Sequence, residues 1–123
     1  GLAQGALDEA LAYAKERRAF GKPIGSHQVI RHKLAEIAVK IEAGRDLTYH
    51  ALRLFVDGQD AVREVTMAKL ATQRCNFECQ DALLGLLGPD PELERAARDA
   101  RLGPIGGGTD EIMREILGRS MGL

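Results

Sequence analysis

The sequence has little net charge, no long apolar run and no export signal, and each absence argues against a kind of protein. Its 17 lysines and arginines nearly balance its 18 aspartates and glutamates, and a formal net charge of −1 argues against a surface for nucleic acid or an anionic membrane. No apolar stretch approaches the ~18 residues of a membrane-spanning helix. The first residues lack the basic-then-apolar pattern of a secretory signal, and they include no initiator methionine. Because the chain opens already in a helical pattern, we expect it to be a fragment of a longer protein.

Cysteine is also scarce, since only Cys75 and Cys79 are present, four positions apart. On a helix this spacing puts both side chains on one face, which does not suit a disulfide within a straight helix. A metal site would need further ligands, and His27, His32 and His50 show no matching spacing, so we expect no metal. Buried, reduced thiols are the better interpretation. They favour a cytosolic or organelle-matrix protein, and we expect a cytoplasmic one.

Helical periodicity covers most of the chain, and no segment alternates as a strand does. With 123 residues, 45% of them apolar, the chain has the size and composition of one globular domain, 1–123. The predicted helices are 2–19, 27–57, 60–87, 91–101 and a last one that follows Thr109. Long helices joined by short turns predict an all-α fold, an antiparallel bundle.

The two longest predicted helices carry apolar residues at helical spacing along their whole length. In 27–57 the pattern continues to Leu52 and Phe55, which is typical of the seam of a helix bundle. Gly44 lowers helix stability by about 1 kcal/mol relative to Ala, and we interpret it as a close crossing with a neighbouring helix. The seam in 60–87 consists largely of small residues, so its neighbour should approach closely.

Three glycines, Gly106–Gly108, precede the last predicted helix. Thr109 suits the N-cap position, and Asp110 and Glu111 fall in the first turn, where the helix dipole favours negative charge. Glycine permits positive φ and close approach, and a helix N-terminus offers free N–H groups to an oxygen-rich ligand. A plain tight loop has the same local pattern, so these residues alone leave both interpretations open.

Blocks at both ends of the chain resemble the acyl-CoA dehydrogenases. The first block reads GLAQ at 1–4, ALDEA at 6–10 and RRAFGKPI at 17–24, and the second reads RDAR at 98–101 and PIGGGTDEIM at 104–113. The resemblance implies the family's C-terminal domain, a four-helix bundle, with the N-terminal helical and middle β-domains outside this sequence. It also implies FAD as cofactor, an acyl-CoA substrate, an electron-transfer acceptor, and a homo-oligomer that is a dimer or tetramer.

Several residues inherit candidate roles from this resemblance. The Arg of the family's R-x-x-F motif, here Arg17, reaches the flavin dinucleotide of a neighbouring subunit, and its planar fork suits phosphate oxygens. The cofactor-binding candidates are Arg17, Phe20, His27, Gln28, Gly88, Thr109 and Glu111, and the substrate-binding candidates are Gly107 and Gly108. Simpler roles remain open: Arg17 as a solvated cation at a helix end, Phe20 as a plug over that end, and His27 as a surface residue.

The sequence departs from the family's pattern at two places. Where the family usually has Gln and a pair of glycines before the short helix, this chain has Leu84 and keeps only Gly88, and Leu forms no side-chain hydrogen bond. Where many members have the Glu that removes the α-proton, this chain has Gly107, which cannot accept a proton. Long-chain and isovaleryl-type members also lack that Glu and take the base from an upstream helix. We therefore expect no catalytic residue in this chain and a base roughly two to three helical turns before Gly1.

The resemblance leads us to predict the C-terminal domain of an FAD-dependent acyl-CoA dehydrogenase that forms a trans-2-enoyl-CoA. This domain would contribute flavin contacts and an oligomer interface, and by itself it should be inactive. A non-catalytic partner subunit of a hetero-oligomeric dehydrogenase is the alternative, which Leu84 favours. A plain helical interaction module without a ligand is the third possibility.

Overall fold

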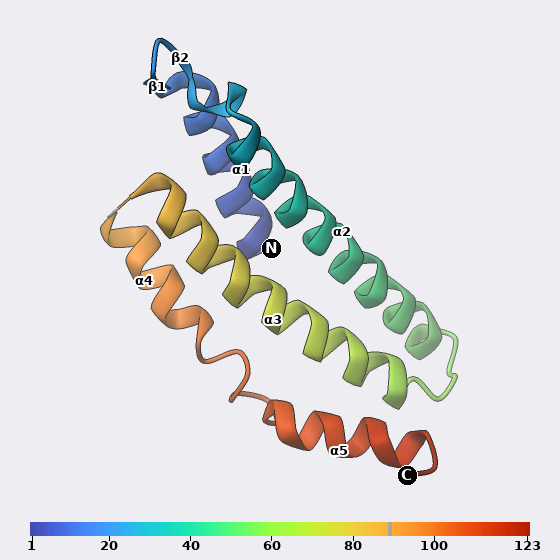
Figure 1. Cartoon of the computed structure of the whole chain (residues 1–123). Coiled ribbons are helices and arrows are strands. Elements are labelled where there is room, and N and C mark those ends of the chain that lie inside the picture. Colours follow the sequence, from blue (N-terminus) through green and yellow to red (C-terminus); the bar gives the residue numbers. More distant parts are fainter. Residues whose placement is uncertain (89) are drawn as a thin grey trace.

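A computed structural model of the chain describes residues 1–88 and 90–123, which are mostly helical (Figure 1). The helices are α1 (Leu2–Glu16), α2 (Gln28–Val56), α3 (Val62–Leu87), α4 (Pro91–Ala100) and α5 (Asp110–Ser120). Between α1 and α2 lie a hairpin of two short strands, β1 (Arg18–Ala19) and β2 (Lys22–Pro23), and a 3-10 turn, Ile24–Ser26. The all-α prediction is confirmed. Among the described residues, no helix is both long enough and apolar enough to span a membrane.

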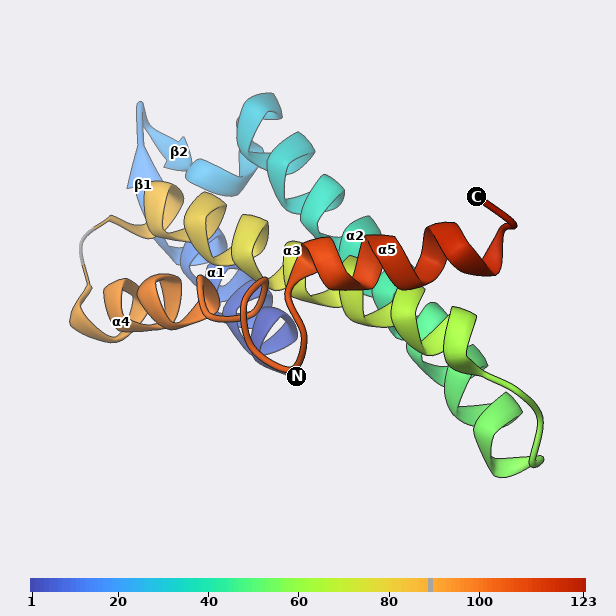
Figure 2. The same ribbon diagram turned by 90° about the horizontal axis from the view of Figure 1, so that it is seen from below.

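Helix α3 is the centre of the arrangement, because it contacts each of the other four helices. The chain runs up α1, down α2 and back up α3, so that successive long helices are antiparallel (Figure 1). Helices α4 and α5 then follow α3 one after the other, α4 along its C-terminal half and α5 along its N-terminal half (Figures 1 and 2). Together these two short helices occupy the position of a fourth helix of the bundle.

The core lies where α1 packs against both α2 and α3. It is filled by small side chains of α1, large aliphatic side chains of α2, and a thiol and a leucine of α3. The buried residues of this cluster are Ala6, Leu7, Ala10, Ala14, Leu34, Ile37, Ile41, Cys79 and Leu83. The buried alanines give α1 a narrow packing face.

The first helix ends three residues earlier than predicted, at Glu16 and not at residue 19. Arg17 is extended, and the chain then reverses through Phe20 and Gly21, whose φ values are +51° and +80°. Arg18 pairs with Pro23 across the resulting hairpin, and its guanidinium donates to the Gly21 carbonyl at 2.7 Å. The residues on either side of two consecutive positive-φ residues must be extended. The helix therefore ends before the turn that Phe20 and Gly21 form.

The apolar seam of α2 is not buried along its whole length. Leu52 is 49% exposed and Phe55 is 71% exposed. The reason is length, because α1 has 15 residues and spans about 22 Å, whereas α2 has 29 and spans about 43 Å. The C-terminal half of α2 therefore extends past α1. The N-terminal part of α3, which follows α2 in the chain, extends past α1 as well. We call the exposed apolar residues at this end the distal apolar face: Leu52, Phe55, Val56, Val62 and Val65.

Candidate functional site

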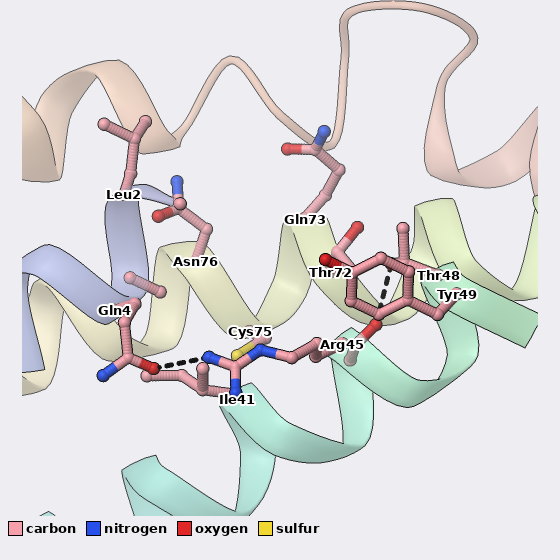
Figure 3. A pocket seen from close by; sticks show the side chains of 13 residues that line it. Leu2, Gln4, Ile41, Arg45, Thr48, Tyr49, Thr72, Gln73, Cys75 and Asn76 are labelled. Carbon is pink, nitrogen blue, oxygen red and sulfur yellow. Dashed lines mark hydrogen bonds between the residues drawn. The ribbon is translucent and has the colours of Figure 1, made fainter. Parts of the chain in front are cut away.

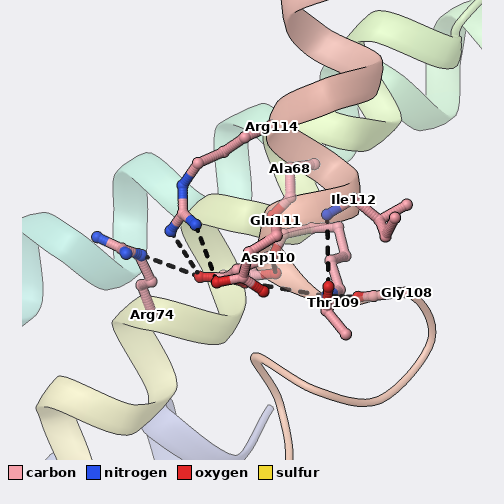
Figure 4. A network of polar contacts seen from close by, with 10 residues as sticks. Ala68, Arg74, Gly108, Thr109, Asp110, Glu111, Ile112 and Arg114 are labelled. Atoms are coloured by element: carbon pink, nitrogen blue, oxygen red, sulfur yellow. Dashed lines mark hydrogen bonds and ion pairs between the residues drawn. The ribbon is translucent and has the colours of Figure 1, made fainter.

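The glycine loop has the conformation that its sequence favours. Gly107 and Gly108 have φ values of +65° and +94°, in the left-handed region that glycine tolerates. The Asp110 N–H donates to the Pro104 carbonyl at 2.9 Å and closes the loop. Thr109 caps α5 as predicted, because its hydroxyl oxygen accepts from the Ile112 N–H at 3.4 Å (Figure 4).

Gly107 and Gly108 differ in the space around them. A Cβ on Gly107 would meet no heavy atom within 4 Å, so the position opens onto free space. A Cβ on Gly108 would lie 2.5 Å from Met113 Cε, at the far end of a flexible side chain. Gly107 is thus the position from which a larger residue would project into open space.

Asp110 is the centre of a charge cluster that the sequence did not predict (Figure 4). Its Oδ2 accepts from Arg74 Nε at 3.2 Å and from Arg114 Nη2 at 3.1 Å. Its Oδ1 lies 4.0 Å from Lys69 Nζ, and the Lys69 ammonium also donates to the Gly108 carbonyl. The spacing of four between Asp110 and Arg114 is typical of an ion pair on one face of a helix. Lys69 and Arg74 lie on α3, and no local sequence pattern connects them to the loop.

The loop's two carboxylates are poorly suited to proton abstraction. Asp110 is buried and held among three cations. The pKa of Glu111 is lowered by its own backbone N–H and by the Thr109 hydroxyl, which makes its carboxylate a weaker base. Neither carboxylate of the loop is therefore a favourable base, and the expectation of no catalytic residue in this chain stays a prediction.

A groove of about 540 Å³, here called the loop groove, lies between α4, the loop that follows it, α3 and the start of α1. Leu2, Gln73, Asn76, Gly106 and Gly107 are among the residues that line it. The first turn of α1 thus lies beside the loop. Any helical extension of α1 upstream of Gly1 would leave from this place.

A second cavity of about 410 Å³ adjoins the loop groove and shares Leu2, Gln73 and Asn76 with it (Figure 3). Arg45 crosses this cavity and donates to Gln4 Oε1 at 2.8 Å, which ties α2 to α1. Asn76 Oδ1 is buried and has no hydrogen-bond partner among the described residues. The cavity is therefore partly polar, with an amide on its wall.

The hairpin brings a second group of candidates together. Phe20 is 96% exposed, and its ring meets the His27 ring edge-on with centroids 6.0 Å apart. His27 Nε2 lies 3.3 Å from the Ala19 carbonyl, and Gln28 Nε2 lies 3.4 Å from His32 Nε2. Phe20 does not plug the end of α1, because the turn directs it into solvent.

Arg17 is exposed at the base of this hairpin, and its guanidinium forms no hydrogen bond or ion pair within residues 1–88 and 90–123. Gly88, with φ +86°, ends α3, and its N–H donates to the Leu84 carbonyl at 3.0 Å. The end of α3 lies beside the start of α2, since a Cβ on Gly85 would lie 3.9 Å from Lys33 Nζ. Gly88 therefore belongs to the hairpin end of the bundle.

The candidates thus form two groups. Arg17, Phe20, His27, Gln28 and Gly88 lie at the hairpin end, whereas Gly107, Gly108, Thr109 and Glu111 lie at the loop. Helix α1 separates the groups by about 22 Å, because it starts beside the loop and ends at the hairpin. Neither the loop groove nor the cavity beside it is lined by a residue of the hairpin group.

The cysteines are free, as predicted, with Cys75 half-buried and Cys79 buried. Their sulfur atoms lie 3.7 Å apart. Burial and the neighbouring Cys75 sulfur raise the pKa of the Cys79 thiol to about 12. No group of three or more metal-ligating side chains occurs in the part of the chain that the structure describes.

Residues 1–122 match the family model described as acyl-CoA dehydrogenase, C-terminal domain. A probable acyl-CoA dehydrogenase of Bacillus subtilis is 42% identical over 98% of this chain and 33% of its own length. A caffeyl-CoA reductase–Etf complex subunit of Acetobacterium woodii is 40% identical over 95% of this chain and 32% of its own. The solved butyryl-CoA dehydrogenase of Megasphaera elsdenii superposes with a TM-score of 0.95 at 29% identity, over 99% of this chain and 33% of its own.

The chain belongs to the acyl-CoA dehydrogenase family and corresponds to its C-terminal domain. It spans about a third of the length of the relatives it matches.

Proposed function

We propose that this chain is the C-terminal domain of an FAD-dependent acyl-CoA dehydrogenase that converts an acyl-CoA thioester to a trans-2-enoyl-CoA. The observation that carries the proposal is the placement of the two resembling blocks. One forms an exposed hairpin with a free guanidinium, and the other forms a glycine loop that leads into a capped helix. Both are arranged to contact something outside this chain.

The residues at the hairpin fit one edge of a flavin dinucleotide. Arg17 has no internal partner among the described residues, so its fork is available for phosphate oxygens. Phe20 offers an exposed aromatic face, and His27 and Gln28 offer polar nitrogens beside it. Leu84 adds no hydrogen bond at this end. FAD, when bound, would accept the hydride from the substrate β-carbon, and Arg17 would hold its phosphates in place.

At the other end, the loop would position the thioester. Gly107 leaves the side of the loop next to the groove open, and Thr109 and the first N–H groups of α5 provide polar contacts. Because Asp110 and Glu111 are poorly suited as bases, we expect the α-proton to go to a carboxylate outside this chain. The chain alone should therefore not turn over substrate.

The distal apolar face supports assembly into a homo-oligomer, a dimer or tetramer. A large exposed apolar patch is typical of an interaction surface. Light scattering that finds only monomers of the complete protein at high concentration would contradict this. The similarity to a subunit of an Etf complex supports an electron-transfer acceptor as a further partner. The reduced thiols support a reducing compartment, and we propose the cytoplasm.

The test of the proposed function uses the complete protein that contains this chain. We expect the purified protein to carry flavin absorbance and expect an acyl-CoA to bleach it under anaerobic conditions. Formation of the α,β-unsaturated product, measured by mass spectrometry, should match the flavin reduced. A protein that binds flavin but is not bleached by any acyl-CoA, from short to long and branched, would contradict the dehydrogenase assignment.

A non-catalytic partner subunit is the second candidate, and Leu84 together with Gly107 favours it. Such a subunit would have lost flavin contacts and would carry no upstream carboxylate. Low flavin content, combined with co-purification of a second acyl-CoA dehydrogenase-type chain, would support this alternative over the first.

A further inference from the structure

We propose that Lys69 and Asp110 are positioning residues that hold the Gly106–Thr109 backbone in one conformation for the cofactor and thioester. The inference rests on the proposed function, because that function gives the loop its role. Neither residue was a candidate from the sequence. Both are placed by contacts between α3 and the loop.

The loop needs an external tie because glycine does not fix its own backbone. Gly107 and Gly108 are consecutive residues with positive φ, and free glycine also populates many other conformations. Ordering such a backbone loses conformational entropy of about 1–2 kcal/mol per residue. Backbone bonds tie the two ends of the loop, from the Gly106 N–H to the Leu102 carbonyl at 2.8 Å and from the Asp110 N–H to the Pro104 carbonyl at 2.9 Å. Neither of these bonds involves Gly107 or Gly108.

Lys69 supplies the tie at the middle of the loop. Its ammonium donates to the carbonyl of Gly108, and its side chain is only 16% exposed. Because Lys69 lies in the N-terminal half of α3, this bond anchors the loop to the helix that contacts the other four. A hydrogen bond to a charged donor is among the stronger ones.

Asp110 keeps the Lys69 ammonium in place. Its carboxylate is 6% exposed, and its Oδ1 lies 4.0 Å from Lys69 Nζ. Arg74 and Arg114 both bind the other oxygen, so Lys69 is the cation that, among the described residues, connects this carboxylate to the loop carbonyl. A nearly buried ammonium is unfavourable without a counter-charge, and Asp110 provides one.

Lys69 binds the loop, whereas Arg74 and Arg114 bind Asp110, so the position of the loop can be altered without unfolding the domain. Replacing Lys69 by Met removes the bond to the Gly108 carbonyl but leaves Asp110 paired with both arginines, so α5 should stay docked on α3. The predicted defect is therefore a loose loop on an intact domain. Lys69→Arg should restore part of the function, because a guanidinium can still donate to the carbonyl.

The experiment compares Lys69→Met, Lys69→Arg and a control, Lys40→Met, in the complete protein. Lys40 is an exposed lysine that pairs with Glu78 on the opposite helix, away from the loop. Stopped-flow measurement of flavin reduction by an acyl-CoA gives the limiting rate and the half-saturating concentration. We expect Lys69→Met to lower the limiting rate by about tenfold or more, the scale of a small misplacement of reacting groups, with the half-saturating concentration unchanged. Lys40→Met should match the wild type, and Lys69→Arg should lie between.

Amide hydrogen exchange on the same proteins provides a readout that needs no activity. Exchange at Ile105–Thr109 should be faster in Lys69→Met than in the wild type, with α1–α3 unchanged. Unchanged exchange in the loop, or an equal loss of rate in Lys40→Met, would overturn the proposal. So would faster exchange throughout the bundle, because the defect would then be one of folding. If the wild-type protein dehydrogenates no acyl-CoA, the proposed function fails, and the exchange comparison alone decides whether Lys69 positions the loop.

Discussion

Gly44 of α2 lies directly against Thr72 of α3, and a Cβ built on Gly44 would be 3.4 Å from Thr72 Cγ2. Gly44 is buried, so the expected close crossing of two helices is confirmed. The remaining space accepts one methyl group and little more.

The crossing predicts opposite effects for small and large substitutions. Gly44→Ala should be tolerated or should stabilise by up to about 1 kcal/mol, the gain in helix propensity. Gly44→Val should destabilise by about 1–3 kcal/mol through overpacking against Thr72. Chemical unfolding of the complete protein measures both. The control is Gly5→Ala on α1, where a Cβ meets nothing within 4 Å. A tolerated Val at position 44 would show that α2 and α3 can move apart at this point.

Asp90 caps α4, and its loss should have a local effect. Its Oδ1 accepts from the N–H groups of Glu92 and Leu93 at 2.9 and 3.1 Å. Asp90→Ala should destabilise by about 1 kcal/mol, whereas Asp90→Asn, which can still accept these bonds, should lose much less. Urea unfolding with the two variants in parallel checks this. Equal losses for Ala and Asn would assign the effect to the charge of Asp90 and not to its hydrogen bonds.

The starts of α4 and α5 were predictable because capping is local. Asp90 and Thr109 each lie within three residues of the N–H groups they bind. The Asp110 cluster was not predictable, because its cations on α3 are 36 or more positions away in sequence. The resemblance identified both blocks, but only the structure shows that α1 holds them apart.

Exposure is the other feature that periodicity could not supply. The spacing of Leu52 and Phe55 correctly identifies an apolar face of α2, since it continues the buried row of Leu34, Ile37 and Ile41. A pattern on one helix does not indicate what covers that face. How much of this face is covered depends on the length of α1. That helix ends at a turn of two positive-φ residues, which the sequence indicates only weakly.

Cys79 should make the stability of the protein fall at alkaline pH. Burial raises the pKa of its thiol to about 12, above the usual value of about 9. Between these values the unfolded chain loses the proton and the folded chain keeps it, so the folded state binds more protons and loses stability as pH rises. One proton corresponds to about 1.4 kcal/mol per pH unit over this window. The measurement is the free energy of unfolding from pH 8 upward, compared between wild type and Cys79→Ala. A parallel decline in both would mean that other groups account for the whole loss.

Arg17 should contribute to retention of flavin in the complete protein. The motif resemblance and its free guanidinium both suggest a charge-assisted contact with phosphate. Arg17→Ala should weaken flavin binding by about 1.5–3 kcal/mol. Flavin absorbance after extensive dialysis measures the loss. Arg18→Ala is the matched control, because Arg18 donates to the Gly21 carbonyl within the hairpin. Unchanged flavin content in Arg17→Ala would leave Arg17 as a solvated cation at the end of α1.

The last prediction concerns the missing base. Because Gly107 stands at the family's loop Glu position and α1 starts beside the loop, an active protein should carry a Glu on the helix upstream of Gly1, roughly two to three turns away. Replacing that Glu by Gln should abolish flavin reduction by an acyl-CoA. Adding Gly107→Glu should restore part of it, since the position is open. The rescue should be incomplete, because φ of +65° in the left-handed region costs a non-glycine residue about 1–2 kcal/mol.

The pH profile of the rescued variant shows whether the new carboxylate accepts the proton or whether the added side chain only fills space in the loop. If the carboxylate introduced by Gly107→Glu accepts the proton, flavin reduction should rise with pH through the pKa of a carboxyl group and then level off. The control is Gly107→Gln in the same background, which has the same shape, carries the same backbone strain and cannot accept the proton, so it should remain inactive. Equal rescue by Gln would mean that the loop side chain acts by filling space. Dehydrogenation by a protein with no upstream carboxylate would show that the base comes from elsewhere, and absence of both carboxylate and activity would favour the partner subunit.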